Sequence, residues 1–353
     1  MSRTHFHTFD AMRFFAFLLV FLLHLPKTNI PYVDFFLKSG SIGVIFFFVL
    51  SGFLITYILL YEKENRGSIS LKKFFARRIL RIWPLFYLLV AFAYLSPYLL
   101  RLFHIPFENQ GYEPRLWVSL LFAENYMMMI TDQFPDGAPL RVMWSICIEE
   151  HFYILWGILF YLLPVKRILP LSLCCILLAH MVRFIYAYYD IAPIDLFTHL
   201  DYFAFGAIPA YLFMYKKHTI EQLNKIPKAV KYLFALITLG VVFTIPNLEW
   251  EQIDYLFPLL WGILFSVCIL FTLGSNPLRI SNNSWLTKLG LYTYGLYLYH
   301  TIIILLLLKF IPVLQFSHWL LLSASALLLT ILVSIISYRV FEKPFLRLKK
   351  HFY

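Results

Sequence analysis

The stretch Trp144–Pro164, WSICIEEHFYILWGILFYLLP, decides the fold class of this chain. Two adjacent carboxylates, Glu149 and Glu150, stand near the head of an apolar run. The run is about as long as the ~20 residues that an α-helix needs to cross a bilayer. Because an ionised carboxylate in lipid is costly, these glutamates either lie at a membrane interface or serve a function.

The composition extends this interpretation to the whole chain. Of 353 residues, 61% are hydrophobic and only 14% are charged, against roughly 25% charged residues in an average soluble domain. A soluble fold could not bury this much apolar surface, so we expect an integral membrane protein of the all-α class. The four cysteines lie in apolar runs without metal-ligand spacing, so we expect neither a metal site nor a disulfide framework.

Ten apolar segments predict about ten transmembrane helices in one membrane domain that covers residues 1–353. The first begins with FDAMRFFAFLLVFLLHLP, which lacks the small-residue cleavage site of a signal peptide and is therefore interpreted as a span. The segments fall near residues 9–25, 41–61, 78–100, 143–163, 168–187, 200–215, 229–246, 254–273, 289–309 and 318–340.

The charges between these segments predict the orientation. Residues 62–81 hold seven Lys or Arg against two Glu, and residues 216–231 hold five Lys against one Glu, so these loops are expected in the cytoplasm. Residues 102–140 hold five acidic side chains against one Arg, and residues 247–254 hold acidic but no basic side chains. These loops are therefore expected outside. Both termini are then cytoplasmic. The excess of base follows membrane topology, and no nucleic-acid partner is expected.

The first span carries two basic groups, Arg13 and His24. They are eleven residues apart, so on a helix they lie on one face, ~16 Å apart along the axis. One interpretation is a polar track across the membrane, with Arg13 toward the cytoplasm and His24 toward the outside. The alternative is that Arg13 snorkels to lipid phosphate and His24 caps a helix end.

The fourth span places Ser145, Glu149 and Glu150 near its outer end, at a depth similar to that of His24. A His and a carboxylate suit acyl transfer to an alcohol, because the imidazole takes the hydroxyl proton and the carboxylate fixes the ring's tautomer. The alternative is that both glutamates are solvated at the interface. Glu149 shares a helix face with Ser145 and Tyr153 while Glu150 points about 100° away, so at least one glutamate must face protein.

At the start of the third span, RRILRIWPLFY presents Arg77, Arg78 and Arg81. Guanidinium groups at a helix N-terminus are suited to phosphate, but without other evidence a positive-inside anchor is the better explanation of the three arginines. Trp83 is expected as an aromatic at the membrane interface. His300, in a later apolar span, is as often a packing residue as a functional one.

Six stretches, taken in order, resemble the acyltransferase-3 family of polytopic bacterial membrane acyltransferases, which includes enzymes that O-acetylate surface polysaccharides and O-antigen. They span nearly the whole chain. They are FDAMRFFAFLLVFLLH, RRILRIWPLFY, WSICIEEHFY, HLDYFAFGAIPAYL, YGLYLYH and SYRVFEKPFLRL.

The resemblance implies an acetyl-CoA-dependent O-acetyltransferase of the bacterial inner membrane, with a cytoplasmic donor and a saccharide or lipid-linked glycan acceptor at the outer face. It implies that His24 is the catalytic base and that Glu149 or Glu150 is its acidic partner. Arg13, Arg77, Arg78 and Arg81 would bind the donor. The residues expected to contact substrate are Ser145, Asp201, Tyr297 and His300.

The chain departs from the family pattern at two positions, with His199 where Arg is frequent and His151 where Gln is usual, and both put acceptor contacts in doubt. Some family members carry a fused extracytoplasmic hydrolase-like domain. Because this chain ends about ten residues after the last span, we expect it either to modify the acceptor directly or to pass acetyl to a separate extracytoplasmic protein. A transporter or flippase for an anion or saccharide is the alternative class, and a structural subunit ranks last.

Overall fold

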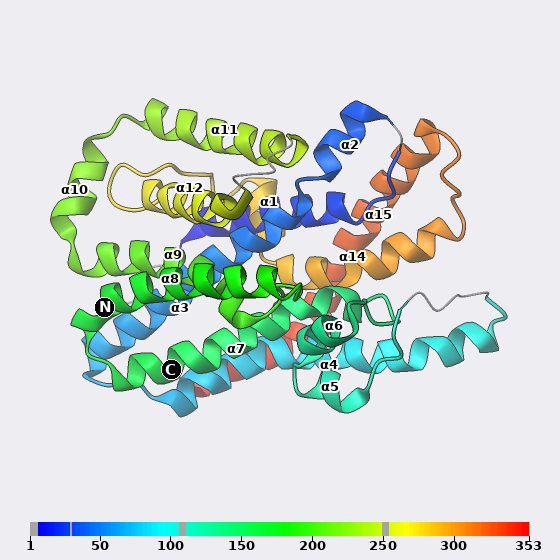
Figure 1. Ribbon diagram of the computed structural model, residues 1–353, viewed down its shortest axis with the longest axis horizontal. Coiled ribbons are helices and arrows are strands. Elements are labelled where there is room, and N and C mark those ends of the chain that lie inside the picture. Colours follow the sequence, from blue (N-terminus) through cyan, green and yellow to red (C-terminus); the bar gives the residue numbers. More distant parts are fainter. Residues whose placement is uncertain (1–5, 29, 106–110, 249–253, 353) are drawn as a thin grey trace. The chain divides into compact units, whose positions relative to one another are not determined.

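The computed structural model describes residues 6–28, 30–105, 111–248 and 254–352, and Figure 1 shows them as helices joined by turns. In these ranges the one strand-like pairing is an isolated bridge between Tyr112 and Pro135. The predicted all-α class is therefore confirmed. Parts of both acidic loops, residues 106–110 and 249–253, lie outside the described residues.

Each of the ten apolar segments forms one helix. These helices are α1 (His7–Leu23), α3 (Gly40–Arg66), α4 (Leu71–Leu102), α7 (Leu140–Leu162), α8 (Ile168–Tyr188), α9 (Leu196–Tyr215), α11 (Lys228–Thr244), α12 (Phe257–Phe271), α14 (Thr293–Leu308) and α15 (Phe316–Ser337). Shorter helices are α2 (Pro31–Leu37), α5 (Leu116–Leu120), α6 (Glu124–Thr131), α10 (Lys217–Lys225), α13 (Trp285–Gly290) and α16 (Lys343–Leu348). Tighter or wider helical turns are η1 (Val165–Arg167), η2 (Ile245–Asn247), η3 (Asp254–Leu256), η4 (Tyr338–Glu342) and η5 (Lys349–Phe352).

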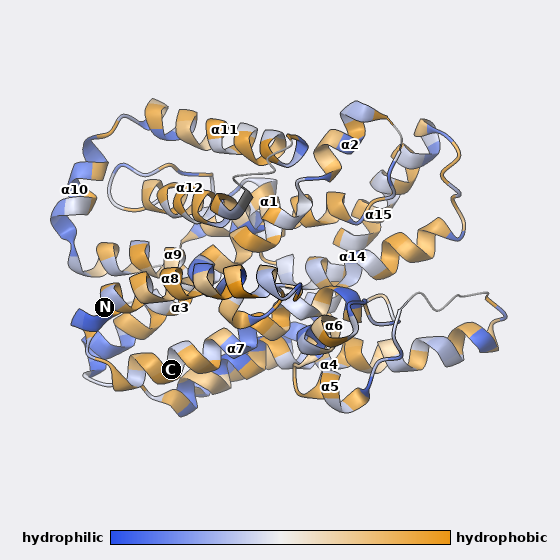
Figure 2. Ribbon diagram, in the orientation of Figure 1, coloured by the Kyte–Doolittle hydropathy of each residue, from blue (hydrophilic) through white to orange (hydrophobic). Residues whose placement is uncertain are grey.

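By length and composition, six helical stretches within the described residues could cross a membrane. They are Pro31–Arg66, Leu71–Leu102, Leu140–Leu162, Val165–Tyr188, Lys228–Asn247 and Phe316–Phe352. Two shorter helices, α12 and α14, are also apolar. Figure 2 shows the hydrophobic colour along most of the long helices, whereas α10 is mainly hydrophilic. The count of ten spans and the orientation of the termini stay predictions.

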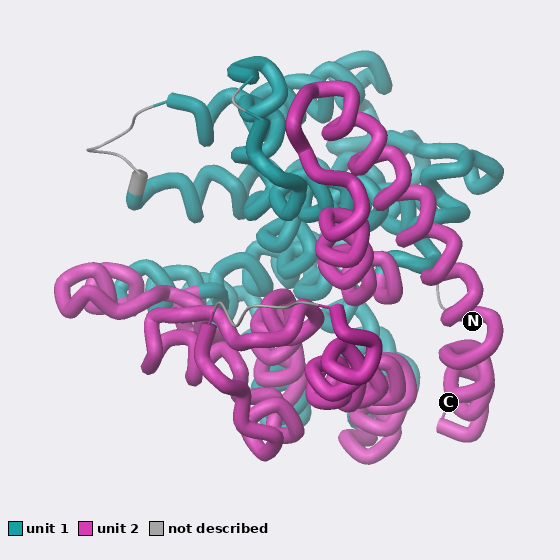
Figure 3. Tube along the Cα trace, turned by 90° about the vertical axis from the view of Figure 1, so that its right-hand side faces the viewer, with its two compact units in different colours: residues 1–69, 155–181, 199–293 teal, residues 70–154, 182–198, 294–353 magenta. Residues whose placement is uncertain are grey.

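Two compact units make up the described chain, and each consists of three sequence segments (Figure 3). Unit 1 comprises residues 1–69, 155–181 and 199–293, and unit 2 comprises residues 70–154, 182–198 and 294–353. Helix α7 contributes its first part to unit 2 and its last turns to unit 1. The expectation of one membrane domain stays a prediction, and each unit is described by itself.

In unit 1, α1 is held in place by close packing against α3. Glycines on α3 make this possible, because a Cβ at Gly43 would meet the carbonyl oxygen of Ala16 and a Cβ at Gly40 would meet Leu23. Small residues let helix backbones approach closely. This packing is common between helices in lipid, where the hydrophobic effect does not drive helices together. Ala16 and Phe17 are fully buried as a result, so the helix that carries Arg13 and His24 has a defined rotation.

In unit 2, α4 begins at a conventional cap, where the Ser70 hydroxyl accepts the Lys73 backbone N–H at 3.4 Å. The segment after α4 is tied together by the buried carboxylate of Glu124, which accepts the Tyr112 hydroxyl at 2.5 Å and the Ser119 hydroxyl at 2.6 Å. Burial, followed by the hydrogen bond to Glu124, raises the pKa of Tyr112, so this phenol keeps the proton that it donates. Glu124 therefore anchors the segment beside α7.

Candidate active site

On α1, Arg13 is paired within its own helix. Its Nη1 lies 2.8 Å from Oδ1 of Asp10, one turn earlier, and the side chains are 20% and 6% exposed, respectively. The i, i+3 spacing places the two groups on one face of the helix. An aspartate in the first turn also interacts favourably with the helix dipole.

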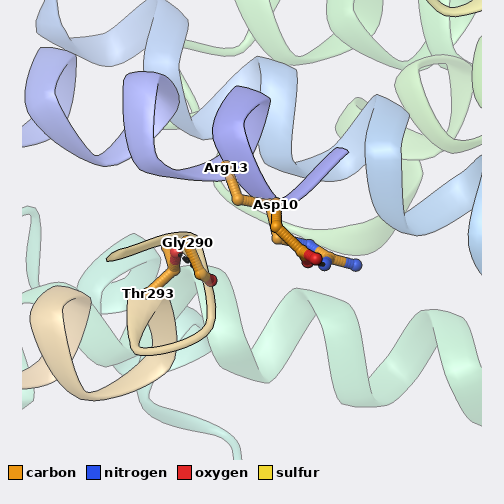
Figure 4. Close-up of polar contacts among 4 residues, drawn as sticks. All are labelled: Asp10, Arg13, Gly290 and Thr293. Carbon is orange, nitrogen blue, oxygen red and sulfur yellow. Dashed lines mark hydrogen bonds and ion pairs between the residues drawn. The ribbon is translucent and has the colours of Figure 1, made fainter. Parts of the chain in front are cut away.

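The Asp10–Arg13 pair lies beside the end of α13 (Figure 4). At Gly290 a Cβ would meet the main-chain carbonyl of Asp10, so only glycine permits this approach. The Thr293 hydroxyl donates to the carbonyl of Gly290 at 2.7 Å and closes the turn between α13 and α14. The turn between α13 and α14, far from α1 in the sequence, thus packs closely against the backbone at Asp10.

His24 caps the other end of α1 and is half-buried. Its Nδ1 lies 2.8 Å from the carbonyl oxygen of Val20. A carbonyl can only accept, so the geometry assigns the proton of the neutral ring to Nδ1 and leaves a lone pair on Nε2. In this tautomer Nε2 is the basic nitrogen, and the bond to Val20 helps to orient the ring.

In unit 2, the two glutamates of α7 have separate partners. The carboxylate of Glu150 is 7% exposed, and its Oε2 accepts the indole N–H of Trp83 at 3.1 Å. Its Oε1 is buried without a hydrogen-bond partner among the described residues. The expectation that at least one glutamate faces protein is confirmed. Trp83, expected as an interfacial aromatic, also donates a hydrogen bond to Glu150.

Glu149 is less buried than Glu150 and belongs to a chain of contacts that leads to α4. Its Oε2 accepts the hydroxyl of Tyr153, one turn along α7, at 2.8 Å. The guanidinium of Arg78 lies over the Tyr153 ring, 5.9 Å from its centroid, which is the geometry of a cation–π interaction. One of the predicted donor-binding arginines therefore reaches a predicted catalytic carboxylate through a single tyrosine.

Ser145 and Tyr297 form a clamp between α7 and α14. Their hydroxyl oxygens are 2.6 Å apart, and the Tyr297 hydroxyl also donates to the carbonyl of Val142 at 3.0 Å. Both side chains are buried. His300, one turn further along α14, is fully buried with its Nδ1 2.6 Å from the carbonyl of Tyr297. The structure brings these three predicted substrate residues together in unit 2, and their contact with substrate stays a prediction.

Asp201, the fourth predicted substrate residue, belongs to unit 1. It is fully buried, its Oδ1 accepts the backbone N–H of Tyr202 at 2.9 Å, and its Oδ2 lies 3.9 Å from Nδ1 of His180 on α8. The ring of His199, which stands where the family pattern frequently has Arg, packs edge-on against Phe48. Sequence reasoning did not identify His180.

The three arginines of α4 have different surroundings. Arg77 is 5% exposed and donates from Nη1 to the carbonyl of Phe352 at 2.6 Å. Arg78 turns toward α7 as described, and Arg81 is exposed. The hydrogen bond from Arg77 to Phe352 positions the C-terminal segment, and the role of Arg77 in donor binding stays a prediction.

The predicted residues thus divide between the two units. Arg13, His24 and Asp201 belong to unit 1, whereas the glutamates, Ser145, Tyr297, His300 and the α4 arginines belong to unit 2. The pairing of His24 with a glutamate stays a prediction. Within the part of the chain that the structure describes, no three His, Cys, Asp or Glu side chains gather as metal ligands would.

Comparison with known proteins assigns this helical chain to a family of acyltransferases. The family model described as an acyltransferase domain, of the acyltransferase-3 family, matches residues 6–339. The chain therefore belongs to the acyltransferase-3 family, and the resemblance seen in the sequence is confirmed.

Relatives with curated names are similar over most of this chain. The peptidoglycan O-acetyltransferase OatA of Listeria monocytogenes is 28% identical over 364 residues, which cover 97% of this chain and 56% of OatA. The Bacillus subtilis protein named "Putative peptidoglycan O-acetyltransferase YrhL" is 28% identical over 320 residues, which cover 84% of this chain and 48% of YrhL. The chain thus spans about half the length of these relatives. No solved structure matches it.

Proposed function

We propose that the protein is a multi-pass inner-membrane O-acetyltransferase that moves an acetyl group from cytoplasmic acetyl-CoA to a hydroxyl of an extracytoplasmic saccharide. Membership of the acyltransferase-3 family supports the reaction class. The names of the relatives, which are peptidoglycan O-acetyltransferases, support a cell-wall saccharide as acceptor. The observation that carries the proposal is the contact of 2.8 Å between Nδ1 of His24 and the Val20 carbonyl, which favours a proton on Nδ1 and a basic Nε2.

In this mechanism, Nε2 of His24 takes the proton of the acceptor hydroxyl while the hydroxyl oxygen attacks the thioester carbonyl. The tetrahedral intermediate then expels the thiolate of CoA, and the imidazolium returns the proton to it. The Nδ1–H bond to Val20 holds the ring in place through both steps. In this proposal Glu149 or Glu150 stabilises the imidazolium. The acetyl group passes from CoA to the attacking hydroxyl without an acetyl-His24 intermediate.

The donor would enter from the cytoplasmic side, where Arg13, Arg78 and Arg81 meet its phosphates. Guanidinium groups bind phosphate through paired N–H donors. Arg77 would act there indirectly, because its hydrogen bond to the Phe352 carbonyl holds the C-terminal segment. Ten spans with both termini in the cytoplasm complete the proposed topology, which the basic loops at residues 62–81 and 216–231 support.

The acceptor would be reached either directly or through a separate extracytoplasmic protein that accepts acetyl. Each expected substrate residue, Ser145, Asp201, Tyr297 and His300, is buried among its own contacts. We therefore propose that these four residues mainly line the site near the acyl group and contribute less to binding the sugar.

The test is acetyl transfer by the full chain purified into lipid nanodiscs, with radiolabelled acetyl-CoA as donor and cell-wall saccharide as acceptor. We expect label in the saccharide and free CoA in equal amounts. Hydrolysis or transfer that is no faster than in nanodiscs without protein, combined with uptake of a labelled anion into vesicles that contain the chain, would replace this proposal with the transporter class.

A further inference from the structure

The C-terminal segment of unit 2 folds back on the start of α4. Both α16 and η5 pack against α4, and the guanidinium of the buried Arg77 donates to the carbonyl of Phe352 at 2.6 Å. This bond joins residues that are 275 positions apart in the sequence. A buried arginine is costly without such a partner, so Arg77 fixes the C-terminal segment beside the first turns of α4.

The two packed segments carry positive charge and no acidic residue. Residues 71–81 contain five Lys or Arg, and residues 343–352 contain four. Five of these cations have exposed side chains: Lys72, Arg81, Lys343, Arg347 and Lys350. The carboxylate next to this set, Glu342, is buried and accepts the Ser337 hydroxyl at 3.4 Å. Like charges on one surface repel one another, and an anion with several charges relieves that repulsion.

We propose that the first turns of α4 and the segment α16–η5 together form one basic surface, which binds the phosphate groups of the CoA donor. The inference rests on the proposed function and adds Arg347 and Lys350 to the donor site. Coenzyme A presents a pyrophosphate and a separate ribose phosphate, so its negative charges are spread over its length. Cations on two adjacent segments match that spread better than a single helix end does.

The contacts on the inner side of this surface favour an acyl donor over a lipid headgroup. Arg78, in the same turns of α4, lies over the ring of Tyr153, and the Tyr153 hydroxyl donates to Glu149. Through Tyr153, the surface therefore connects with a carboxylate proposed to act in the reaction. A positive-inside anchor for anionic lipid would not need that connection.

The experiment compares the wild-type chain with the double variant Arg347→Gln/Lys350→Gln, each in nanodiscs of neutral phosphatidylcholine, by direct CoA binding and by acetyl-transfer kinetics. Both side chains are exposed, so the variant should fold, and a thermal unfolding curve checks this. We expect the Kd for CoA and the KM for acetyl-CoA to rise about tenfold with kcat unchanged, the size expected from losing two exposed charge contacts. Raising the ionic strength should shrink the difference between the two proteins, because salt screens exposed charges.

The matched control is Lys216→Gln/Lys217→Gln, which removes the same charge from exposed positions at the start of α10 in the other unit. It should leave the Kd for CoA unchanged. Equal CoA binding by wild type and the Arg347/Lys350 variant would overturn this inference and leave the proposed function standing. A difference that appears only in nanodiscs with anionic lipid would overturn it in favour of a lipid site. Absence of CoA binding and of transfer by the wild type would overturn the proposed function itself.

Discussion

Helices α1 and α7 both place charged groups within apolar sequence, but they satisfy those groups in different ways. On α1, Arg13 is paired with Asp10 three residues away and His24 with the Val20 carbonyl four residues away. On α7, Glu150 accepts from Trp83, 67 positions away, and Ser145 pairs with Tyr297, 152 positions away. These contacts of Arg13 and His24 thus lie within α1, whereas Glu150 and Ser145 on α7 contact side chains of α4 and α14.

The difference predicts where mutations act. Replacing Asp10 on α1 removes a contact that lies within one helix. Removing a partner of α7 leaves a buried polar group without its donor, which costs about 1–3 kcal/mol, and it also alters the packing between helices. The following changes test this contrast.

The largest expected effect is that of Glu150→Gln on acetyl transfer. Glu150 is buried and has a carboxylate oxygen without a described partner, so we expect it, rather than Glu149, to stabilise charge in the reaction. Its replacement should lower kcat by about 10²–10⁴-fold, while Glu149→Gln should lower it far less. A Glu149→Gln variant that loses as much kcat as Glu150→Gln would show that the two carboxylates share the role.

The next effect is on stability. Trp83→Phe keeps an aromatic ring but removes the N–H that Glu150 accepts, so the free energy of unfolding should fall by about 1–3 kcal/mol. Thermal unfolding in nanodiscs measures this, with Trp285→Phe, an exposed tryptophan in unit 1, as control. Equal melting temperatures for the two variants would mean that the indole donor contributes nothing to the fold.

A smaller loss is expected from Ser145→Ala. The Tyr297 hydroxyl keeps its bond to the Val142 carbonyl. The single Ser145 proton is shared between the Tyr297 hydroxyl at 2.6 Å and the Val142 carbonyl at 3.2 Å, so its loss should cost about 0.5–1.5 kcal/mol. Tyr297→Phe removes both bonds of the Tyr297 hydroxyl, including the one that links α14 to the Val142 carbonyl, and should cost more. The same unfolding measurement would contradict the clamp if Ser145→Ala were the more harmful change.

The smallest effect should come from Asp10→Asn. The pair is partly buried, with side chains 20% and 6% exposed, but asparagine removes only the charge of residue 10, so we expect a loss of stability no larger than that of Ser145→Ala. The asparagine oxygen can still accept from Arg13. A loss of stability larger than that of Trp83→Phe, in the same assay, would break the contrast between α1 and α7.

The sequence foresaw the helices well because each apolar run of membrane length forms one. Their ends were harder to place, since α4 extends over Leu71–Leu102 whereas the apolar run predicted 78–100. The Ser70 cap and the basic first turns continue the helix beyond its apolar part, and hydropathy alone does not register a cap.

For the candidate site, the sequence indicated the candidate residues but not most of the groups that they contact. The i, i+3 spacing of Asp10 and Arg13 is visible in the sequence, and so is the placement of Glu149 and Tyr153 on one helix face. Trp83 was interpreted as an interfacial aromatic, and Arg77 as a phosphate ligand. Their contacts with Glu150 and with the Phe352 carbonyl depend on tertiary packing across 67 and 275 positions, which no local pattern encodes.

The central claim is that His24, with its Nδ1–H held by Val20, is the base for acetyl transfer. The direct measurement is kcat for transfer of labelled acetyl from acetyl-CoA to saccharide by His24→Ala, beside His218→Ala, an exposed histidine on α10. We predict that His24→Ala loses about 10²–10⁴-fold in kcat while its unfolding temperature and CoA binding stay near wild type, and that His218→Ala is unchanged. Wild-type kcat in folded His24→Ala protein would contradict the account.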